Sequence, residues 1–212
     1  MTDICLFPIP DCVTFPGTLF PLHVFEPRYR TMMYRALEER LPVAICHVEK
    51  QLSPSKPDQT LEEALNSNQA TYRPQAVFSA GLCELKEITN DGRMYLNVHM
   101  QERYRAVEEK QTLPYMVWAC EPFLDQPASA DEHQQNLQLQ EKILVRFHAL
   151  AHRYPELQST FPEEHLRSMS PEAFSFRLFG AISFGSELQQ EILEMDSAHQ
   201  RLTEALSLLN QV

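Results

Sequence analysis

The strongest constraint on the fold is a change in hydrophobic patterning close to Glu121. Up to about residue 122, short apolar runs alternate with turn signals, whereas the rest of the chain carries apolar residues at three- and four-residue steps. The first pattern is typical of strands and the second of amphipathic helices. The sequence therefore predicts an α+β protein, with a small β-barrel over 1–122 followed by a helical bundle over 123–212.

The β part contains one clear hairpin signal. The Asp-Gly pair in Asn90-Asp91-Gly92-Arg93 supplies the positive φ angles that a tight turn needs. After this turn, apolar residues alternate with polar ones from 94 to 100, as in a strand with one buried face. Further strands are expected at 4–7, 42–48, 103–107 and 116–120.

One helix and one long polar segment interrupt these strands. Pro27 suits the first helical position, and the helix is expected over about 28–40, burying Met32, Met33, Ala36 and Leu37. The segment from Lys50 to Pro74 is rich in Ser, Pro, Asn and Gln. We expect it to be a loop with a short helix at 61–65, and loops of this length are often functional.

Three helices are expected in the second part. The first runs from about 131 to 154, with Leu139, Ile143, Phe147, Leu150 and Tyr154 on its apolar stripe. The second starts at Ser170 before Pro171, carries Phe174, Leu178 and Ile182, and is closed by Gly185. The third is a single last helix, which carries the apolar residues Leu188, Ile192, Met195, Leu202, Leu206 and Leu209.

Composition narrows the choice of environment and partner. The 212 residues hold no apolar run near the roughly 18 needed to span a membrane, and no signal segment, so we expect a cytoplasmic protein. A net charge of -11 opposes nucleic acid and anionic membranes. The five cysteines are scattered and odd in number, which indicates reduced thiols rather than disulfides or a zinc site.

No motif for chemistry is complete. Gly180 and Gly185 have the spacing of a phosphate-binding loop, but Ser186 and Glu187 follow where the lysine should stand. His148 and His152 lie one helical turn apart, yet the glutamate of the metalloprotease helix is missing, and surface polar residues are the favoured interpretation. His199 fits a hydrogen-bonded core or interface histidine. We therefore predict no cofactor and no metal.

Three stretches resemble a known family. Residues 11–30, with Phe15-Pro16-Gly17 and Phe25-Glu26-Pro27-Arg28-Tyr29, look like the opening signature of the Lon N-terminal domain family. Residues 80–115, with the 91–93 turn and Arg103-Tyr104-Arg105, form a second match, and residues 193–202 resemble the family's closing helix. The chain departs from the family pattern at Leu82 and Met100. We expect these departures to alter local backbone geometry rather than the fold.

The resemblance implies a fold and a role. In that family a PUA-like β pseudo-barrel with one intervening helix precedes a helical bundle, and together they make one substrate-recognition domain. It implies binding of unfolded or degron-bearing polypeptide, with a protease or chaperone as a further partner, and no ATPase or Ser-Lys peptidase activity in this chain. The candidate binding residues on the matched segments are Phe20, Phe25, Glu26, Arg28, Tyr29, Arg103 and Tyr104.

Other interpretations stay open at this point. For the signature residues, shaping turns, starting the helix and bracing the barrel is favoured over direct ligand contact, because a buried charge requires a partner. A hydrolase whose nucleophile is assembled from distant Ser or Cys and His is one alternative function. RNA binding, suggested only by the PUA-like barrel, is another. The oligomeric state and the identity of the client are not determined by the sequence.

Overall fold

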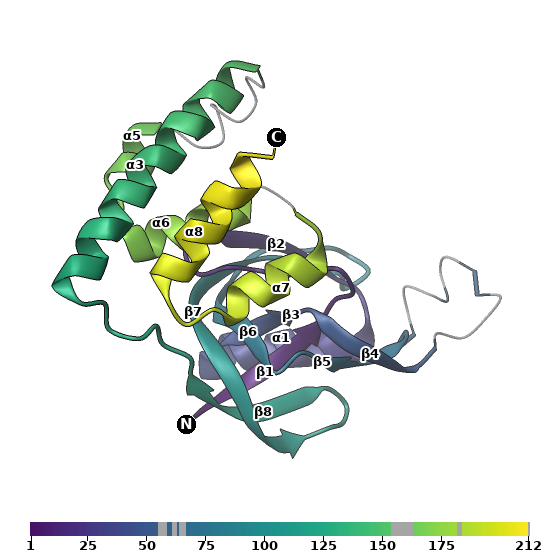
Figure 1. The fold of residues 1–212 in the computed structure, drawn as a ribbon. Helices are drawn as coiled ribbons and strands as arrows, with labels where there is room; N and C mark the ends of the chain where they lie inside the picture. The colour runs from purple at the N-terminus through teal and green to yellow at the C-terminus, as the bar shows by residue number, and fades with distance from the viewer. Residues whose placement is uncertain (55–58, 61–62, 64–66, 154–162, 182–183, 212) are drawn as a thin grey trace. The chain divides into compact units, whose positions relative to one another are not determined.

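The computed structural model describes residues 1–54, 59–60, 63, 67–153, 163–181 and 184–211 (Figure 1). The chain divides into two compact units, Met1–Phe123 and Leu124–Val212. The described elements of the first unit are strands and the helix at 27–39, and those of the second are helices. The predicted α+β class is confirmed. No helix among the described residues is long and apolar enough to cross a membrane.

The first unit is built around a long strand that changes partners along its length. Its elements are β1 (Thr2–Pro8), β2 (Leu19–Val24), α1 (Pro27–Glu39), β3 (Val43–Cys46), β4 (Val48–Ser53), β5 (Thr71–Pro74), β6 (Val77–Ile88), β7 (Met94–Gln111) and β8 (Met116–Pro122). The sheet order is β2-β7-β6-β3-β1-β8, and a further pairing of β7 with β8 closes a ring. β1 and β3 run parallel, whereas the other pairs in this sheet are antiparallel.

Two apolar clusters fill this unit. One joins α1, through Tyr29, Met32, Met33 and Ala36, to buried residues of β1, β2, β3, β7 and β8. The other is built from Ile4, Leu6, Ala44, Cys46, Phe78, Ala80 and Cys120, with Tyr104, Ala106 and Trp118 packed against it. Every strand of the closed ring contributes to this second cluster. β1 and β3 are therefore covered on both faces, which explains their nearly continuous apolar sequence.

A β-bulge allows β7 to change its pairing partners along its length and so to close the ring. The register of β6 with β7 shifts between Ala80, opposite Glu102, and Gly81, opposite Met100. A bulge of this kind bends a strand and increases its twist. The backbones approach so closely here that a Cβ on Gly81 would lie 1.6 Å from the carbonyl oxygen of His99. Glycine is required at this position by contact with the neighbouring strand rather than by a positive φ angle.

Several sequence expectations for this unit need correction. Residues 103–107 are not a separate short strand, because the bulge allows β7 to continue to Gln111. The expected strand at 42–48 is two strands, β3 and β4, which join different sheets. β2 was not expected as a strand. The ends of the supposed loop from Lys50 to Pro74 pair as a two-stranded sheet, β4 with β5. Most of the short helix expected at 61–65 lies outside the described residues.

The second unit contains α3 (Ala130–Arg153), α5 (Glu163–Arg167), α6 (Pro171–Ala181), α7 (Ser186–Glu194) and α8 (Ala198–Leu209). Its core holds a fully buried cation, Arg201. The guanidinium donates to both carboxylate oxygens of Asp125, to the Ser175 hydroxyl and to the Met195 carbonyl, and lies 3.8 Å from the Phe176 ring centroid. These partners offset the desolvation of the charge and join the start of the unit to α6 and α8.

The predicted helices lie at the expected positions, but the end of α6 and the continuity of the last helix were predicted wrongly. The single last helix is broken between Glu194 and Ala198, where Ser197 accepts from the His199 N–H as the N-cap of α8. Gly185 does not close α6, which ends at Ala181; with φ +88° it precedes α7. The short helix α5 was not expected. Tyr154 and Ile182, placed on apolar stripes from the sequence, lie outside the described residues.

We predict that Gly81→Ala disrupts the first unit. The new methyl group would overlap backbone atoms of β7, which cannot move without breaking the ring, so we expect a loss of about 3 kcal/mol or more, or no folding. Urea unfolding followed by Trp118 emission measures the effect.

Gly17→Ala is the matched control. Gly17 has φ +78° but no atom within 4 Å of its would-be Cβ, so only backbone strain of about 1–2 kcal/mol applies. Equal losses for the two variants would show that the close approach at Gly81 does not constrain the fold.

Candidate functional site

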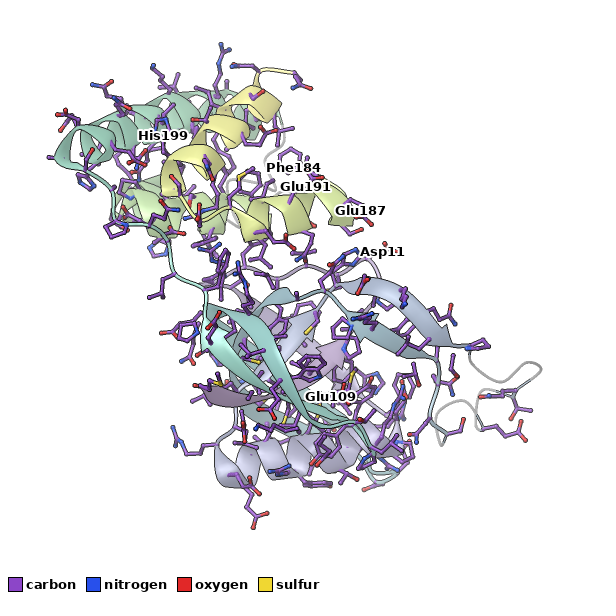
Figure 2. The ribbon with its side chains drawn as sticks, turned by 60° about the horizontal axis from the view of Figure 1, so that its bottom comes forward. Asp11, Glu109, Phe184, Glu187, Glu191 and His199 are labelled. Atoms are coloured by element: carbon purple, nitrogen blue, oxygen red, sulfur yellow. The ribbon has the colours of Figure 1, made fainter. Side chains whose placement is uncertain are left out.

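A hollow of about 310 Å³ opens in the first unit between β5 and the turn that joins β7 to β8. Its wall combines the start of α1, strand β5, the β7–β8 turn and the beginning of β8. The lining residues are Arg28, Tyr29, Leu52, Thr71, Tyr72, Arg73, Pro74, Glu109, Thr112, Leu113, Pro114, Tyr115, Met116 and Trp118. We call this hollow and its neighbour, described next, the Trp118 cleft. Figure 2 places Glu109, a member of this wall, on β7.

The neighbouring hollow of about 320 Å³ shares Arg73, Pro74 and Trp118 with the first. It is completed by Glu49, Gln75, Ala76 and Ala106. Because the same three side chains line both, the Trp118 indole and the end of β5 separate two adjoining depressions on one unit.

The rim of the Trp118 cleft exposes apolar side chains. Leu113 is 80% exposed and Leu52 is 56% exposed, whereas Tyr115 in the same turn is buried. The turn is held by a hydrogen bond of 2.9 Å from Gln111 Nε2 to the Tyr115 carbonyl, and it contains a cis Leu113-Pro114 bond. Water-exposed leucines beside an aromatic hollow are typical of a surface that binds another molecule.

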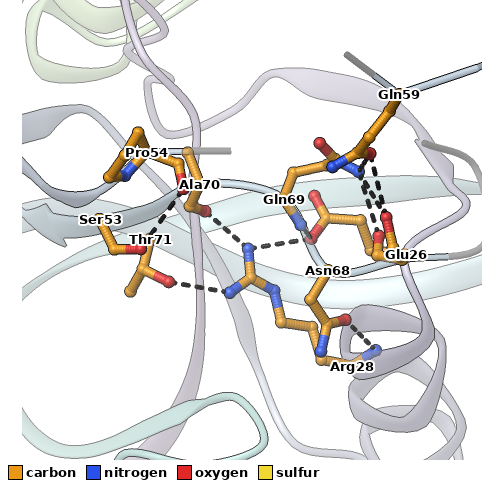
Figure 3. Close-up of polar contacts among 10 residues, drawn as sticks. Glu26, Arg28, Ser53, Pro54, Gln59, Asn68, Gln69, Ala70 and Thr71 are labelled. Carbon is orange, nitrogen blue, oxygen red and sulfur yellow. Dashed lines mark hydrogen bonds and ion pairs between the residues drawn. The ribbon is translucent and has the colours of Figure 1, made fainter. Parts of the chain in front are cut away.

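An ion pair at the start of α1 fixes β5, one wall of the cleft (Figure 3). Arg28 Nη2 lies 2.9 Å from Glu26 Oε2 and donates to the Ala70 carbonyl at 2.8 Å, while Nη1 donates to the Thr71 hydroxyl at 3.3 Å. The Glu26 carboxylate also accepts from the Gln69 N–H at 2.9 Å. The side chains of Arg28 and Glu26 are only 10% and 13% exposed. The helix start therefore anchors the chain where it enters β5.

Two N–H groups in the cleft wall are buried without a hydrogen-bond partner. They are Nε of Arg28 and Nε1 of the Trp118 indole. A buried donor without an acceptor costs about 1–3 kcal/mol. Both atoms are shielded from solvent, so an acceptor that lies in the cleft does not reach them.

The structure separates the sequence-predicted binding residues into three places. Glu26, Arg28 and Tyr29 lie together beside the cleft, with Arg28 and Tyr29 in its wall. Phe20 packs against the core from β2, and the Phe25 ring lies 5.8 Å from that of His23.

The remaining two predicted residues, Arg103 and Tyr104, sit on β7. Arg103 is buried with its Cζ 4.6 Å from the Phe123 ring centroid, and Tyr104 donates to Glu102 at 3.0 Å. These contacts are within the unit itself.

Sequence reasoning missed most of the cleft wall. From the sequence, Tyr72 and Pro74 are expected in a loop and Trp118 in a strand, and none of them is expected at a binding site. Leu113 belongs to no predicted motif. The available signal was the sole tryptophan of the chain, in an expected strand that follows a Leu-Pro pair.

Nucleophilic chemistry by cysteine is opposed by burial. Desolvation raises the pKa of the Cys5 and Cys12 thiols to about 11 and of Cys83 and Cys120 to about 12, and places that of Cys46 well above its ordinary range. The attacking species is the thiolate. These groups therefore remain protonated near neutral pH.

The histidines do not gather into a site in the described part of the chain. His148 is exposed, and the side chain of His152 lies outside the described residues. His199 lies 2.9 Å from Asn136 Oδ1 through Nδ1, as expected of a hydrogen-bonded, half-buried histidine. Among the described residues no group of three His, Cys, Asp or Glu side chains could hold a metal ion.

Comparisons with known proteins agree with this architecture. The model of the ATP-dependent protease La (LON) substrate-binding domain matches residues 3–211, so the chain belongs to that family. Among solved structures it is similar to the N-terminal domain of a Mycobacterium avium complex Lon protease, with TM-score 0.68, 13% identity and coverage of 99% of this chain and 98% of that one.

A Lon N-terminal domain protein from Xanthomonas campestris is also similar, with TM-score 0.57, 18% identity and 98% coverage of both chains. No curated protein matches. At these identities the structures show a shared fold.

We predict that Arg28→Met destabilises the first unit by about 3 kcal/mol, because it leaves the mostly buried Glu26 carboxylate without its cation. Arg73→Met is the matched control, since its pair with Glu49 is largely exposed and should be worth less than about 1 kcal/mol. Chemical denaturation measures both. Similar losses would mean that the Glu26–Arg28 pair does not anchor β5.

A second prediction concerns thiol reactivity. Because burial raises the pKa of Cys12 from 9.0 to about 11, its thiolate fraction at pH 8 falls about a hundredfold, and the other thiols should be at least as protected. Iodoacetamide followed by mass spectrometry should label the native chain slowly and the urea-unfolded chain quickly. Rapid stoichiometric labelling of one cysteine in the native chain would contradict this prediction and would support the alternative that the chain is a cysteine hydrolase.

Proposed function

We propose that this chain is a polypeptide-recognition module with no catalytic step of its own. It binds unfolded or degron-bearing protein and delivers it to, or docks on, a protease or chaperone partner. The observation that carries the proposal is the match to the LON substrate-binding domain over 3–211. We also propose that its ring is PUA-like, that its two units work as one recognition domain, and that it acts in the cytoplasm.

The Trp118 cleft is the proposed contact site. It combines exposed leucines, aromatic rings and a few polar groups, a mixture suited to apolar polypeptide segments. Of the residues first singled out, Arg28 and Tyr29 form part of the wall, and Glu26 holds Arg28 in place. For Phe20, Phe25, Arg103 and Tyr104, packing within the first unit supports a structural role instead.

The rival functions have less support. Protonated, buried thiols do not favour a cysteine hydrolase. A net charge of -11 does not favour RNA, whose binding rests on clustered basic residues.

Binding of a permanently unfolded protein tests the proposal. We expect the purified chain to bind a reduced, carboxymethylated model protein without ATP, and to suppress its aggregation. Leu113→Asp should weaken binding at least tenfold, because a charge replaces an exposed apolar contact in the cleft. Isothermal titration calorimetry measures the affinity.

Leu19→Asp is the control, since Leu19 is similarly accessible but lies on β2, away from the cleft wall. It should leave binding unchanged. The proposal fails if several unfolded clients show no binding, and the assignment to the cleft fails if both variants lose affinity equally.

A further inference from the structure

We infer that the Trp118 cleft receives an extended segment of its client as an added β-strand, hydrogen-bonded to the free edge of β5. This inference rests on the proposed function and specifies how the client backbone is recognised. The edge in question carries backbone groups of Tyr72 and Pro74, which both lie in the cleft wall.

β5 continues the line of β6 but lacks the neighbour that β6 has. β4 follows β3 after one residue and β5 precedes β6 by two, so the pairing of β3 with β6 carries on into that of β4 with β5. β7 lies beside β6 as far as the pair of Val77 with Arg105, and the Ala106 N–H donates to the Ala76 carbonyl at 2.9 Å. β7 then continues with β8 as its partner. In the described sheets, no strand therefore lies on the second edge of β5.

The alternation of backbone groups shows what this edge offers. Pro74 has no N–H, and its pairing with Val48 uses the Gln75 N–H, which donates to the His47 carbonyl at 2.9 Å. The register shifts of this pair leave out residues of β4, so β5 itself alternates regularly. Successive residues of a strand direct their backbone groups to opposite edges. On the edge away from β4, Tyr72 therefore presents an N–H and a carbonyl, and Pro74 presents a carbonyl.

The cleft leaves room for a strand along this edge. Tyr72 and Pro74 are half-buried rather than buried, and both hollows adjoin Pro74. β5 has four residues, so its edge is about 13 Å long at about 3.3 Å per residue. The side chains of an added strand alternate between its two faces, and one face would contact Trp118 and Leu113 in the cleft wall.

These backbone groups select a polypeptide over other apolar ligands. An added strand would accept a hydrogen bond from the Tyr72 N–H and would donate to the carbonyls of Tyr72 and Pro74. Addition of a strand to a sheet edge is a recurring mode of peptide recognition, in which main-chain hydrogen bonds supply the affinity. A prolyl residue at either donating position of the client would lack the N–H, so the edge disfavours proline there.

Backbone N-methylation of a peptide tests the pairing. The probe is a peptide, capped at both ends, with alternating valines and threonines between terminal lysines. Two matched peptides carry N-methyl groups, which remove the backbone donors, on all the valines or on all the threonines. These two sets lie on opposite edges of an extended chain, and only one edge would face β5.

Trp118 is the only tryptophan of the chain, so its emission reports on the cleft directly. We expect saturable binding of the unmethylated peptide, at least tenfold weaker binding of one methylated peptide, and binding of the other within about twofold. Equal losses for the two methylated peptides, or no loss for either, would overturn the inference in favour of a generic apolar surface.

Tyr72→Pro removes the edge donor from the protein. The Tyr72 N–H does not face β4, and proline is tolerated on edge strands, so the β4–β5 sheet should keep its structure. Tyr72→Ala is the matched control, because it removes the same ring but keeps the N–H. We expect Tyr72→Pro to bind the unmethylated peptide at least about fivefold more weakly than Tyr72→Ala. Equal affinities of two folded variants would contradict the inference.

Hydrogen exchange followed by NMR tests the same amide in the unaltered chain, and it decides if Tyr72→Pro fails to fold. Peptide binding should slow exchange of the Tyr72 N–H at least tenfold and should change that of Arg73, which faces β4, much less. Unchanged exchange at Tyr72 in the saturated complex would overturn the inference.

The remaining outcomes separate this inference from the proposed function. Binding of the unfolded client without binding of the peptide would overturn the inference and leave the proposed function standing. Absence of both would overturn both. Self-association of the chain that Tyr72→Pro abolishes would assign the edge to a second copy of the chain and would also overturn the inference.

Discussion

The fold of the first unit depends on the bulge in β7 opposite Gly81. The strand pairs with β2 and β6 before the bulge and with β6 and β8 after it, so a single strand closes the ring. That closure requires the two backbones to approach within a distance that no side chain at position 81 would allow. The turn after β7 and the start of β8, which form one wall of the Trp118 cleft, are positioned by this geometry.

The opposite wall is held by electrostatics as well as by its connection to the ring. β5 pairs only with β4 in the described sheets and runs after a short connection into β6, so a side-chain contact from α1 adds a second tie. The Arg28 guanidinium provides it through the Ala70 carbonyl and the Thr71 hydroxyl, while Glu26 neutralises its charge (Figure 3). The same residues that begin α1 therefore shape a surface distant from them in the chain. This gives the Phe-Glu-Pro-Arg-Tyr signature a structural role in shaping the proposed contact site.

Local patterns predicted much of the fold. The Asp91-Gly92 turn, the start of α1 at Pro27 and the helical periodicity after residue 130 all follow from short-range rules, and the structure contains each, although only Gly92 and not Asp91 has a positive φ angle in the turn. The rules failed where a tertiary contact decides. β7 reads as two short strands because the bulge interrupts its alternation. β4 and β5 are too polar to stand out as strands until they pair across the intervening segment.

The candidate site was less predictable for a related reason. Glu26, Arg28 and Tyr29 could be singled out because they form one contiguous run. Tyr72, Leu113 and Trp118 lie near these residues because of ring closure and the Arg28 contacts. No spacing in the sequence indicates that they are close together in the fold. A cleft assembled from four separate segments can be recognised only when the topology is known.

Site-specific photocrosslinking tests the central claim most directly. A benzophenone amino acid placed at Leu113, on the cleft rim, or at Leu19, on β2, would be irradiated with a bound unfolded protein, and the products mapped by mass spectrometry. The account predicts abundant crosslinks from position 113, concentrated at apolar segments of the client, and few from position 19. Crosslinks that form equally from both positions, or from position 19 alone, would contradict it.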